Sequence, residues 1–159
     1  LLTTLAIHHL EEVKTYVSYY TLRWLIERYF YTLKSGCKVE ELQLETADRL
    51  DKAIATYAIV AWRLLYLMYQ SRKNPQAPAD TILQTDEWET LYYITHKKPP
   101  PSQPPSLEEA VLGVAKLGGF LARKSDGQPG IKTLWRGLMR LQNYVEMYSL
   151  LKSTGYPYG

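Results

Sequence analysis

The sequence predicts a mostly α-helical chain, and three segments carry that prediction. Apolar residues recur every three or four positions over residues 10–34, 46–71 and 132–152, and this period is typical of helices packed on one face. The chain has 159 residues, of which 46% are hydrophobic, so it can form one modest domain with a packed core. We interpret the apolar run at residues 1–7 as a short buried strand that precedes the first helix.

The first predicted helix spans residues 10–34 and carries an organised charged face. Relative to Tyr20, the offsets of Arg23, Glu27 and Lys34 correspond to roughly 300°, 340° and 320° of helical rotation. The four side chains therefore line one stripe, which holds a phenol, a carboxylate and two cations. Such a stripe suits a metal-binding carboxylate beside phosphate contacts. A solvated face with a Glu27–Arg23 pair is the plainer interpretation.

The opposite side of this helix is apolar and predicts a face that packs on the core. Gly36 follows the helix and is expected to provide a left-handed exit from it. Trp24 borders the charged stripe, and core packing is its expected role. The residues of the predicted core face are Leu22, Leu25, Ile26, Tyr29 and Leu33.

The second predicted helix begins after Thr46, a candidate N-cap, and runs to about Ser71. It is apolar on nearly all sides, so we expect burial on most of its surface. Arg63 lies inside the apolar run, where an arginine must reach solvent or pair with a carboxylate. We favour an acidic partner, which the sequence does not name.

The rest of the chain alternates short helices with proline-rich segments. Thr85 is the candidate cap of a short helix from Asp86 to about Tyr93, and the run 96–106 is a proline-rich spacer. Ser106 and Glu109 form a capping box for a helix that ends near Leu117, before a double glycine. Basic clusters at residues 97–98 and 123–132 suit either a DNA backbone or a solvated loop.

The last predicted helix, residues 132–152, presents a long apolar stripe. We expect it to pair with the same helix of a second subunit around a two-fold axis, because the small domain around it offers little cover. Packing onto Val111, Leu112 and Leu117 within one subunit is the alternative. The proposed interface residues are Leu134, Leu138, Leu141, Val145 and Tyr148, and Leu151 extends the stripe.

Composition excludes several classes of protein. The single cysteine, Cys37, rules out an internal disulfide and fits a reducing cytoplasm. His8, His9 and His96 have no ligand-like spacing with it, so a Cys–His metal site is not expected. The apolar run at residues 57–68 is too short to span a bilayer and contains an arginine. We therefore expect a soluble, cytoplasmic chain with no membrane contact and no small-molecule substrate; its net charge of +3 does not by itself indicate nucleic-acid binding.

The spacing Y-x2-R-x3-E-x6-K resembles the YREK motif of bacterial DDE transposases of the insertion sequence four group. The resemblance extends to the context RW-IE-YF--LKSGC-VEE-QLET, the AWRLLYL run, the KLGGFLARKSDGQPGIKTLWRGL block and the final helix. It covers almost the whole chain. These enzymes move DNA by a cut-and-paste route, in which strand hydrolysis, hairpin formation and strand transfer follow one another.

The resemblance implies a fold and a division of the chain. Residues 1–72 would be the C-terminal strand and helices of an RNase H-like α/β catalytic core. Residues 73–105 would be a proline-rich linker with one short helix, and residues 106–159 a helical C-terminal dimerisation domain. The implied partners are double-stranded transposon-end DNA and a second subunit, in a bacterial cytoplasm.

The resemblance also assigns the charged stripe. Glu27 would be the third catalytic carboxylate and a ligand of Mg2+, with Mn2+ as a substitute, while Tyr20, Arg23 and Lys34 would contact DNA phosphates. All five aspartates follow Glu27, whereas the family places two before its glutamate. We therefore expect this chain to be an inactive C-terminal part of an active transposase. A non-catalytic dimerisation module, which inhibits by forming mixed dimers with full-length enzyme, is the alternative.

Overall fold

The computed structural model describes residues 4–153, with the side chain of Lys152 left out. Its elements are helical, and within that range the β structure is limited to an isolated antiparallel bridge between Pro78 and Ser106. The α-helices are α1 (Leu10–Thr21), α2 (Arg23–Tyr31), α3 (Ala47–Lys73), α4 (Thr85–His96), α5 (Leu107–Leu117) and α6 (Ile131–Ser153). A π-helical turn, η1 (Thr32–Gly36), and two 3-10 turns, η2 (Val39–Glu41) and η3 (Ala79–Thr81), complete the set.

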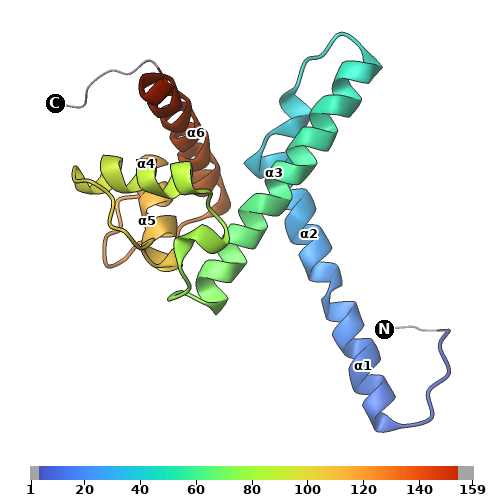
Figure 1. The fold of residues 1–159 in the computed structure, drawn as a ribbon. Helices are drawn as coiled ribbons and strands as arrows, with labels where there is room; N and C mark the ends of the chain where they lie inside the picture. The colour runs from blue at the N-terminus through green and yellow to red at the C-terminus, as the bar shows by residue number, and fades with distance from the viewer. Residues whose placement is uncertain (1–3, 154–159) are drawn as a thin grey trace.

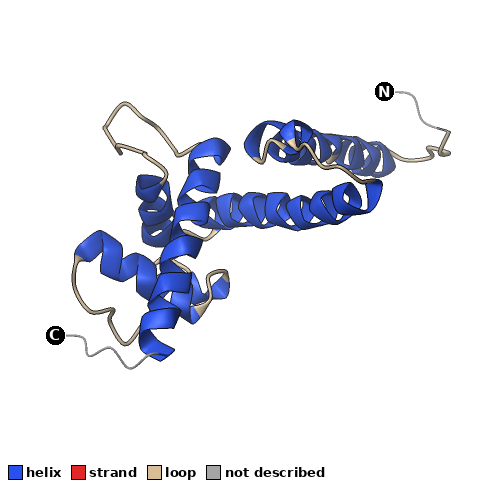
Figure 2. Cartoon of the chain, turned by 90° about the horizontal axis from the view of Figure 1, so that it is seen from above, coloured by secondary structure: helices blue, strands red, loops and turns tan. Residues whose placement is uncertain are grey.

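The helices form an arm and a body (Figure 1). Helices α1 and α2 run almost end to end away from the rest of the chain, while α4, α5 and α6 pack together at the other side of α3. Seen from above, α3 and the arm extend to the same side of the body (Figure 2), but in Figure 1 the N-terminal end of α3 and helix α1 point in different directions. The two ends of α3 therefore have different surroundings, and this difference determines which of its side chains are buried.

The core lies where the C-terminal half of α3 meets α4, α5 and α6. Apolar side chains from all four helices and from the loop before α4 are almost fully excluded from solvent there, and this burial is the main stabilising contribution. Segment 73–105 supplies part of this core through Leu83, Trp88 and Leu91. The most buried large side chains are Leu64, Leu67, Leu83, Leu107, Val114, Leu134 and Leu141.

The strand expected at residues 1–7 does not form over its described part. Residues 4–7 have no strand conformation, and residues 1–3 lie outside the described range. A strand is stabilised by ladder hydrogen bonds to a neighbouring strand, and the described residues offer no such neighbour. The RNase H-like sheet therefore stays a prediction.

The arm is less buried than its apolar pattern predicted. Among its described residues, neither α1 nor α2 contains a buried side chain. Leu33 is buried and Tyr29 packs against the core, as expected, and the Tyr29 hydroxyl donates to the Ala58 carbonyl of α3 at 3.1 Å. Leu22, Leu25 and Ile26 are exposed. These three precede the point where the arm reaches α3, so residues 4–153 offer them little surface to pack on.

Helix α3 shows the same gradient. Thr46 caps it as predicted, with its hydroxyl accepting from the Arg49 amide at 3.4 Å. Its buried residues all lie between Ala61 and Met68, whereas Leu50, Ile54 and Ile59 are exposed. The expectation of burial on most sides was therefore wrong for the N-terminal half, because the packing helices cover only the other end.

Local exits and caps differ from the sequence prediction by one or two residues. The left-handed residue after η1 is Lys38, with φ 58°, and not Gly36. Gly36 is instead buried, because Ile131 of α6 packs against it. The N-cap of α4 is Gln84, one residue before the predicted Thr85, and its partner in the capping box is Glu87.

Candidate functional site

Three of the four predicted stripe residues contact one another at the junction of α1 and α2. Arg23 Nη2 lies 2.9 Å from Glu27 Oε1, one turn along α2. The Arg23 guanidinium carbon also lies 5.5 Å from the centre of the Tyr20 ring, within the range of a cation–π contact. Tyr20, Arg23 and Glu27 thus form a continuous row of phenol, guanidinium and carboxylate on one helix face.

Lys34 does not join this row. Its Nζ pairs with Glu40 Oε1 at 2.8 Å, in the turn that follows η1. Residues 32–36 form a π-helical turn, closed by the Cys37 amide donating to the Thr32 carbonyl at 2.8 Å. Lys34 lies in this turn, seven residues after Glu27, and that spacing corresponds to roughly 10 Å along a helix, too far for a direct contact with the row.

The row is solvent-accessible, and its ion pairs are weak. The side chains of Arg23 and Glu27 are 63% and 52% exposed, and those of Lys34 and Glu40 are 55% and 64% exposed. Exposed pairs of this kind contribute about 1 kcal/mol or less to stability. An incoming phosphate can therefore replace either carboxylate as the partner of its cation at little cost in folding free energy.

The donor set of this chain does not fit a Mg2+ site by itself. Among the described residues, no group of three or more His, Cys, Asp or Glu side chains stands close enough to hold a metal ion. Glu27 brings one carboxylate, and that carboxylate is paired with Arg23. Hard divalent cations take several oxygen ligands, so further carboxylates from outside these residues are required.

A second cation beside the row was not identified from the sequence. The Arg28 guanidinium lies 5.2 Å from the centre of the Trp24 ring, and the Arg28 Nε is buried with no hydrogen-bond partner among the described residues. Trp24 is 57% exposed, so the core role expected for it was wrong. The i, i+4 spacing of tryptophan and arginine was the available signal.

The partner of Arg63 is Glu87 of α4. Arg63 Nη2 lies 2.5 Å from Glu87 Oε2, and the Glu87 side chain is only 10% exposed. The same carboxylate oxygen accepts from the Gln84 amide at 2.9 Å. Glu87 therefore caps α4 and fastens it to α3, and the acidic partner expected for Arg63 is identified.

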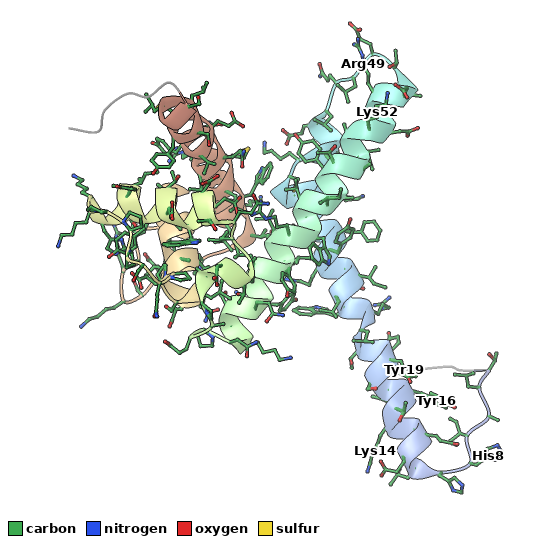
Figure 3. The ribbon with its side chains drawn as sticks, viewed as in Figure 1. His8, Lys14, Tyr16, Tyr19, Arg49 and Lys52 are labelled. Atoms are coloured by element: carbon green, nitrogen blue, oxygen red, sulfur yellow. The ribbon has the colours of Figure 1, made fainter. Side chains whose placement is uncertain are left out.

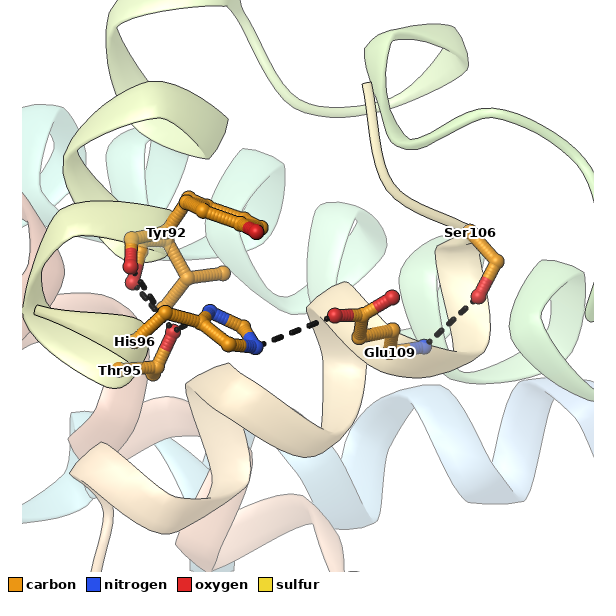
Figure 4. Close-up of polar contacts among 6 residues, drawn as sticks. Tyr92, Thr95, His96, Ser106 and Glu109 are labelled. Carbon is orange, nitrogen blue, oxygen red and sulfur yellow. Dashed lines mark hydrogen bonds and ion pairs between the residues drawn. The ribbon is translucent and has the colours of Figure 1, made fainter. Parts of the chain in front are cut away.

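A hydroxyl, an imidazole and a carboxylate also line up between α4 and α5 (Figure 4). Thr95 Oγ1 lies 2.9 Å from His96 Nδ1, and His96 Nε2 lies 3.3 Å from Glu109 Oε1. The Thr95 hydroxyl also lies 2.7 Å from the Leu91 carbonyl oxygen, which can only accept its proton. His96 stacks on Tyr92 at 4.2 Å between ring centres. We interpret the group as a clamp between two helices and not as a nucleophilic site, because the helix backbone holds the hydroxyl.

The capping box predicted at Ser106 forms in part. The Ser106 hydroxyl accepts from the Glu109 amide at 3.2 Å, as expected. The Glu109 carboxylate is directed to His96.

The apolar stripe of α6 divides between the core and the surface. Leu134 and Leu141 are buried within this chain, at 0% and 1% exposure. Leu138 and Val145 are partly buried against the same core, and Tyr148 lies 6.2 Å from the Tyr93 ring of α4. Packing within the subunit, the alternative interpretation of the stripe, therefore accounts for Leu134 and Leu141. A contact of α6 with a second copy stays a prediction.

Other apolar side chains of α6 face outward. Met139, Tyr144, Met147 and Leu150 are 43–65% exposed. In the described part of the chain, no helix is both long enough and apolar enough to cross a membrane.

Comparison with protein families gives two matches. The family model for the Transposase Tn5 dimerisation domain matches residues 59–155, which include most of α3 and all of α4, α5 and α6. The family model for the Transposase DDE domain matches residues 3–63, which include Tyr20, Arg23, Glu27 and Lys34.

Proposed function

This chain belongs to the Transposase Tn5 dimerisation domain family, and from that membership we propose that it is the C-terminal part of a cut-and-paste DNA transposase. The exposed Tyr20–Arg23–Glu27 row carries the proposal, because it lies in the segment that matches the Transposase DDE domain. Its phenol, guanidinium and carboxylate suit a reaction at a phosphodiester. The spacing of the four residues supports the YREK motif of the insertion sequence four group.

We assign the phosphate contacts to Tyr20, Arg23 and Lys34. Arginine can bind a phosphate through two hydrogen bonds, lysine acts as a point charge, and tyrosine donates one hydrogen bond. In the free chain, Glu27 and Glu40 hold the two cations through exposed pairs. DNA binding would exchange these carboxylates for phosphate oxygens and would release Glu27.

We assign to Glu27 the role of the third catalytic carboxylate. Transposase domains of the DDE type generally use divalent metal ions, and the matched segment contains Glu27. Because the described residues hold no metal-binding group of their own, Mg2+ or Mn2+ would need two further carboxylates from the rest of the catalytic domain. The complete enzyme would hydrolyse one strand, form a hairpin and join the freed end to target DNA, and this chain alone would be inactive.

We propose that α6 supports a homodimer that holds two transposon ends in the bacterial cytoplasm. The match to a dimerisation domain supports the homodimer, and the exposed apolar side chains of α6 provide its surface. A non-catalytic module that forms mixed dimers is the second candidate function. The observation that favours it is the single carboxylate of the row, which leaves the described residues without a metal site.

The DNA contacts are tested by measuring the binding of labelled double-stranded DNA to this chain. Fluorescence anisotropy over a series of salt concentrations gives the affinity. Replacing both cations, Arg23→Gln with Lys34→Gln, should lower affinity and flatten the salt dependence. Glu27→Gln should raise affinity, because it frees Arg23 and removes a negative charge. If all three proteins bound DNA equally, the row would have no role in phosphate binding.

The catalytic role is tested in a longer protein that contains the two further carboxylates. There, Glu27→Ala should abolish cleavage and leave binding to transposon ends largely intact, since a lost metal ligand removes transition-state stabilisation. Normal cleavage by Glu27→Ala would exclude the assignment and favour the non-catalytic module.

A further inference from the structure

A groove of about 650 Å3 lies between α3, the start of α4 and α6. Figure 1 shows α3 and α6 approaching near the N-terminal end of α6 and diverging toward its C-terminal end. We call the apolar lining of the groove its floor and the polar lining, which is rich in arginine and amide side chains, its rim. The floor residues are Val60, Trp135, Leu138 and Met139, and the polar residues are Arg63, Glu87, Arg136, Arg140, Gln142 and Asn143.

One face of α6 carries a row of three cations, of which Arg136 and Arg140 line this rim. Lys132, Arg136 and Arg140 follow one another at intervals of four residues, so each is rotated by about 40° and displaced by roughly 6 Å along the helix from the one before. We call these three residues the α6 basic stripe. Asn143, three residues after Arg140, extends the same face with an amide donor.

The α6 basic stripe is not neutralised by the chain. Among the described residues, none of its three cations has a carboxylate within ion-pair distance, although Arg140 Nη1 donates to the Leu117 carbonyl at 2.6 Å. Cations on the arm and at the start of α3 behave differently (Figure 3). Lys14, Arg49 and Lys52 are each paired with an acidic residue three or four positions away. The stripe therefore keeps a positive potential beside the groove.

We propose that the α6 basic stripe is a second contact for the phosphate backbone of double-stranded DNA, on a different helix from the row around Glu27. The inference rests on the proposed function, because a chain of a transposase family acts on DNA. Lys132 and Arg136 would bind phosphates directly, with Arg140 and Asn143 as flanking donors. Such contacts fix the position of DNA without reading its sequence.

Two other occupants fit the groove less well. The homodimer contact proposed above uses Tyr144, Met147 and Leu150, in the C-terminal half of α6. A second copy that also covered the N-terminal half would bring Lys132, Arg136 and Arg140 against their own equivalents, and like charges repel. An acidic peptide that inserted apolar side chains would need an open floor. The floor is already partly covered, because Leu138 packs on the core and Trp135 makes an edge contact with Tyr57 at 6.2 Å. An anion that needs only the rim is the better match.

The test uses the whole chain and a labelled DNA duplex of arbitrary sequence, with anisotropy measured over a series of KCl concentrations. Lys132→Gln with Arg136→Gln should lower the slope of log K against log salt by about 2, since each lost phosphate contact removes about 0.9. The pair leaves Arg140 and its hydrogen bond to Leu117 in place. Arg72→Gln with Lys73→Gln removes the same charge from the last turn of α3 and should leave the slope nearly unchanged.

Three other results would overturn the proposal that the α6 basic stripe binds DNA phosphates. Equal slopes for the two double variants would reduce the effect to net charge and overturn the proposal, as would a wild-type chain that does not bind DNA. A change in self-association without a change in DNA binding, measured by sedimentation velocity, would assign the stripe to a protein contact. The single variant Arg136→Lys, which keeps the positive charge, should have a slope close to that of the wild type. The Arg23→Gln, Lys34→Gln pair reports on the Glu27 row separately, so the two sites can fail independently.

Discussion

Gly137 of α6 lies against the carbonyl oxygen of Val114 in α5, and a methyl group on Gly137 would stand 1.9 Å from that oxygen. In the same way, a methyl group on Gly118, at the end of α5, would stand 1.9 Å from the carbonyl oxygen of Thr133 in α6. The two helices therefore cross backbone to backbone. The fold depends on this pair of glycines because any side chain would separate α5 from α6.

We predict that Gly137→Ala destabilises the chain. Alanine is more favourable than glycine in a helix by about 1 kcal/mol. The new methyl group would, however, clash with the backbone carbonyl of Val114, which cannot rotate away as a side chain could. Overpacking of this kind costs typically about 1–3 kcal/mol and occasionally more, so the net effect should be a loss of stability. Urea denaturation followed by circular dichroism measures it, and Gly130→Ala, where the space is open, is the control that should change little. A more stable Gly137→Ala would mean that the helices are farther apart.

Glu87→Ala should also destabilise the fold, by about 2 kcal/mol. The substitution removes the ion pair with Arg63 and the cap on Gln84 together, and hydrogen bonds to charged groups contribute about 1.5–3 kcal/mol each when buried. Partial exposure of Arg63 lowers the expected value. A double-mutant cycle with Arg63→Ala isolates the pair, and Asp86→Ala, on the exposed side of the same turn, is the control. Additive effects would show that the pair contributes nothing.

Cys37 should be unreactive in the native state and should make stability fall at high pH. The residue is 5% exposed, and burial raises the pKa of its thiol from 9.0 to about 11. Between those values the unfolded thiol loses its proton and the folded thiol keeps it, so stability decreases as pH rises from about 9 to about 11. The contribution is fully present below pH 9.

This prediction is checked by thiol labelling with and without urea, and by comparing unfolding at pH 7.5 and pH 10 with that of Cys37→Ala. The variant should lose the part of the pH dependence that the thiol causes. Rapid labelling of the folded chain would contradict the burial of Cys37.

Self-association should depend on the outward side of α6. Met147→Glu with Tyr144→Glu should keep the fold and weaken association, because both side chains are exposed, at 60% and 43%. Leu141→Glu should instead unfold the chain, since Leu141 is buried and an unpaired buried charge is costly. Sedimentation velocity and circular dichroism separate these outcomes. Leu121→Glu, which replaces an exposed leucine elsewhere, is the control; loss of association in that variant would place the interface outside α6.

The sequence by itself determined most of the helices and several of their ends. The three- and four-residue periods located α3 and α6 within two residues at either end, because amphipathic burial is a local pattern. The capping box at Ser106 and the double glycine after Leu117 located α5. The caps at Thr46 and Ser106 formed as expected, since a hydroxyl that accepts from an amide three residues later needs nothing beyond its own turn. The contact between Arg23 and Glu27 was likewise predicted by their spacing of four residues, which places them on neighbouring turns of a helix.

The tertiary structure decided what depends on distant partners. The sequence required a carboxylate for Arg63, but only the packing of α4 on α3 chose Glu87. Lys34 paired with Glu40 of η2, a partner that the helical spacing of the sequence did not indicate. Burial assigned Leu134 and Leu141 to the core and left Met147 outside. Periodicity specifies that a face is apolar, whereas the arrangement of all the helices determines which surface, in this chain or in a partner, covers it.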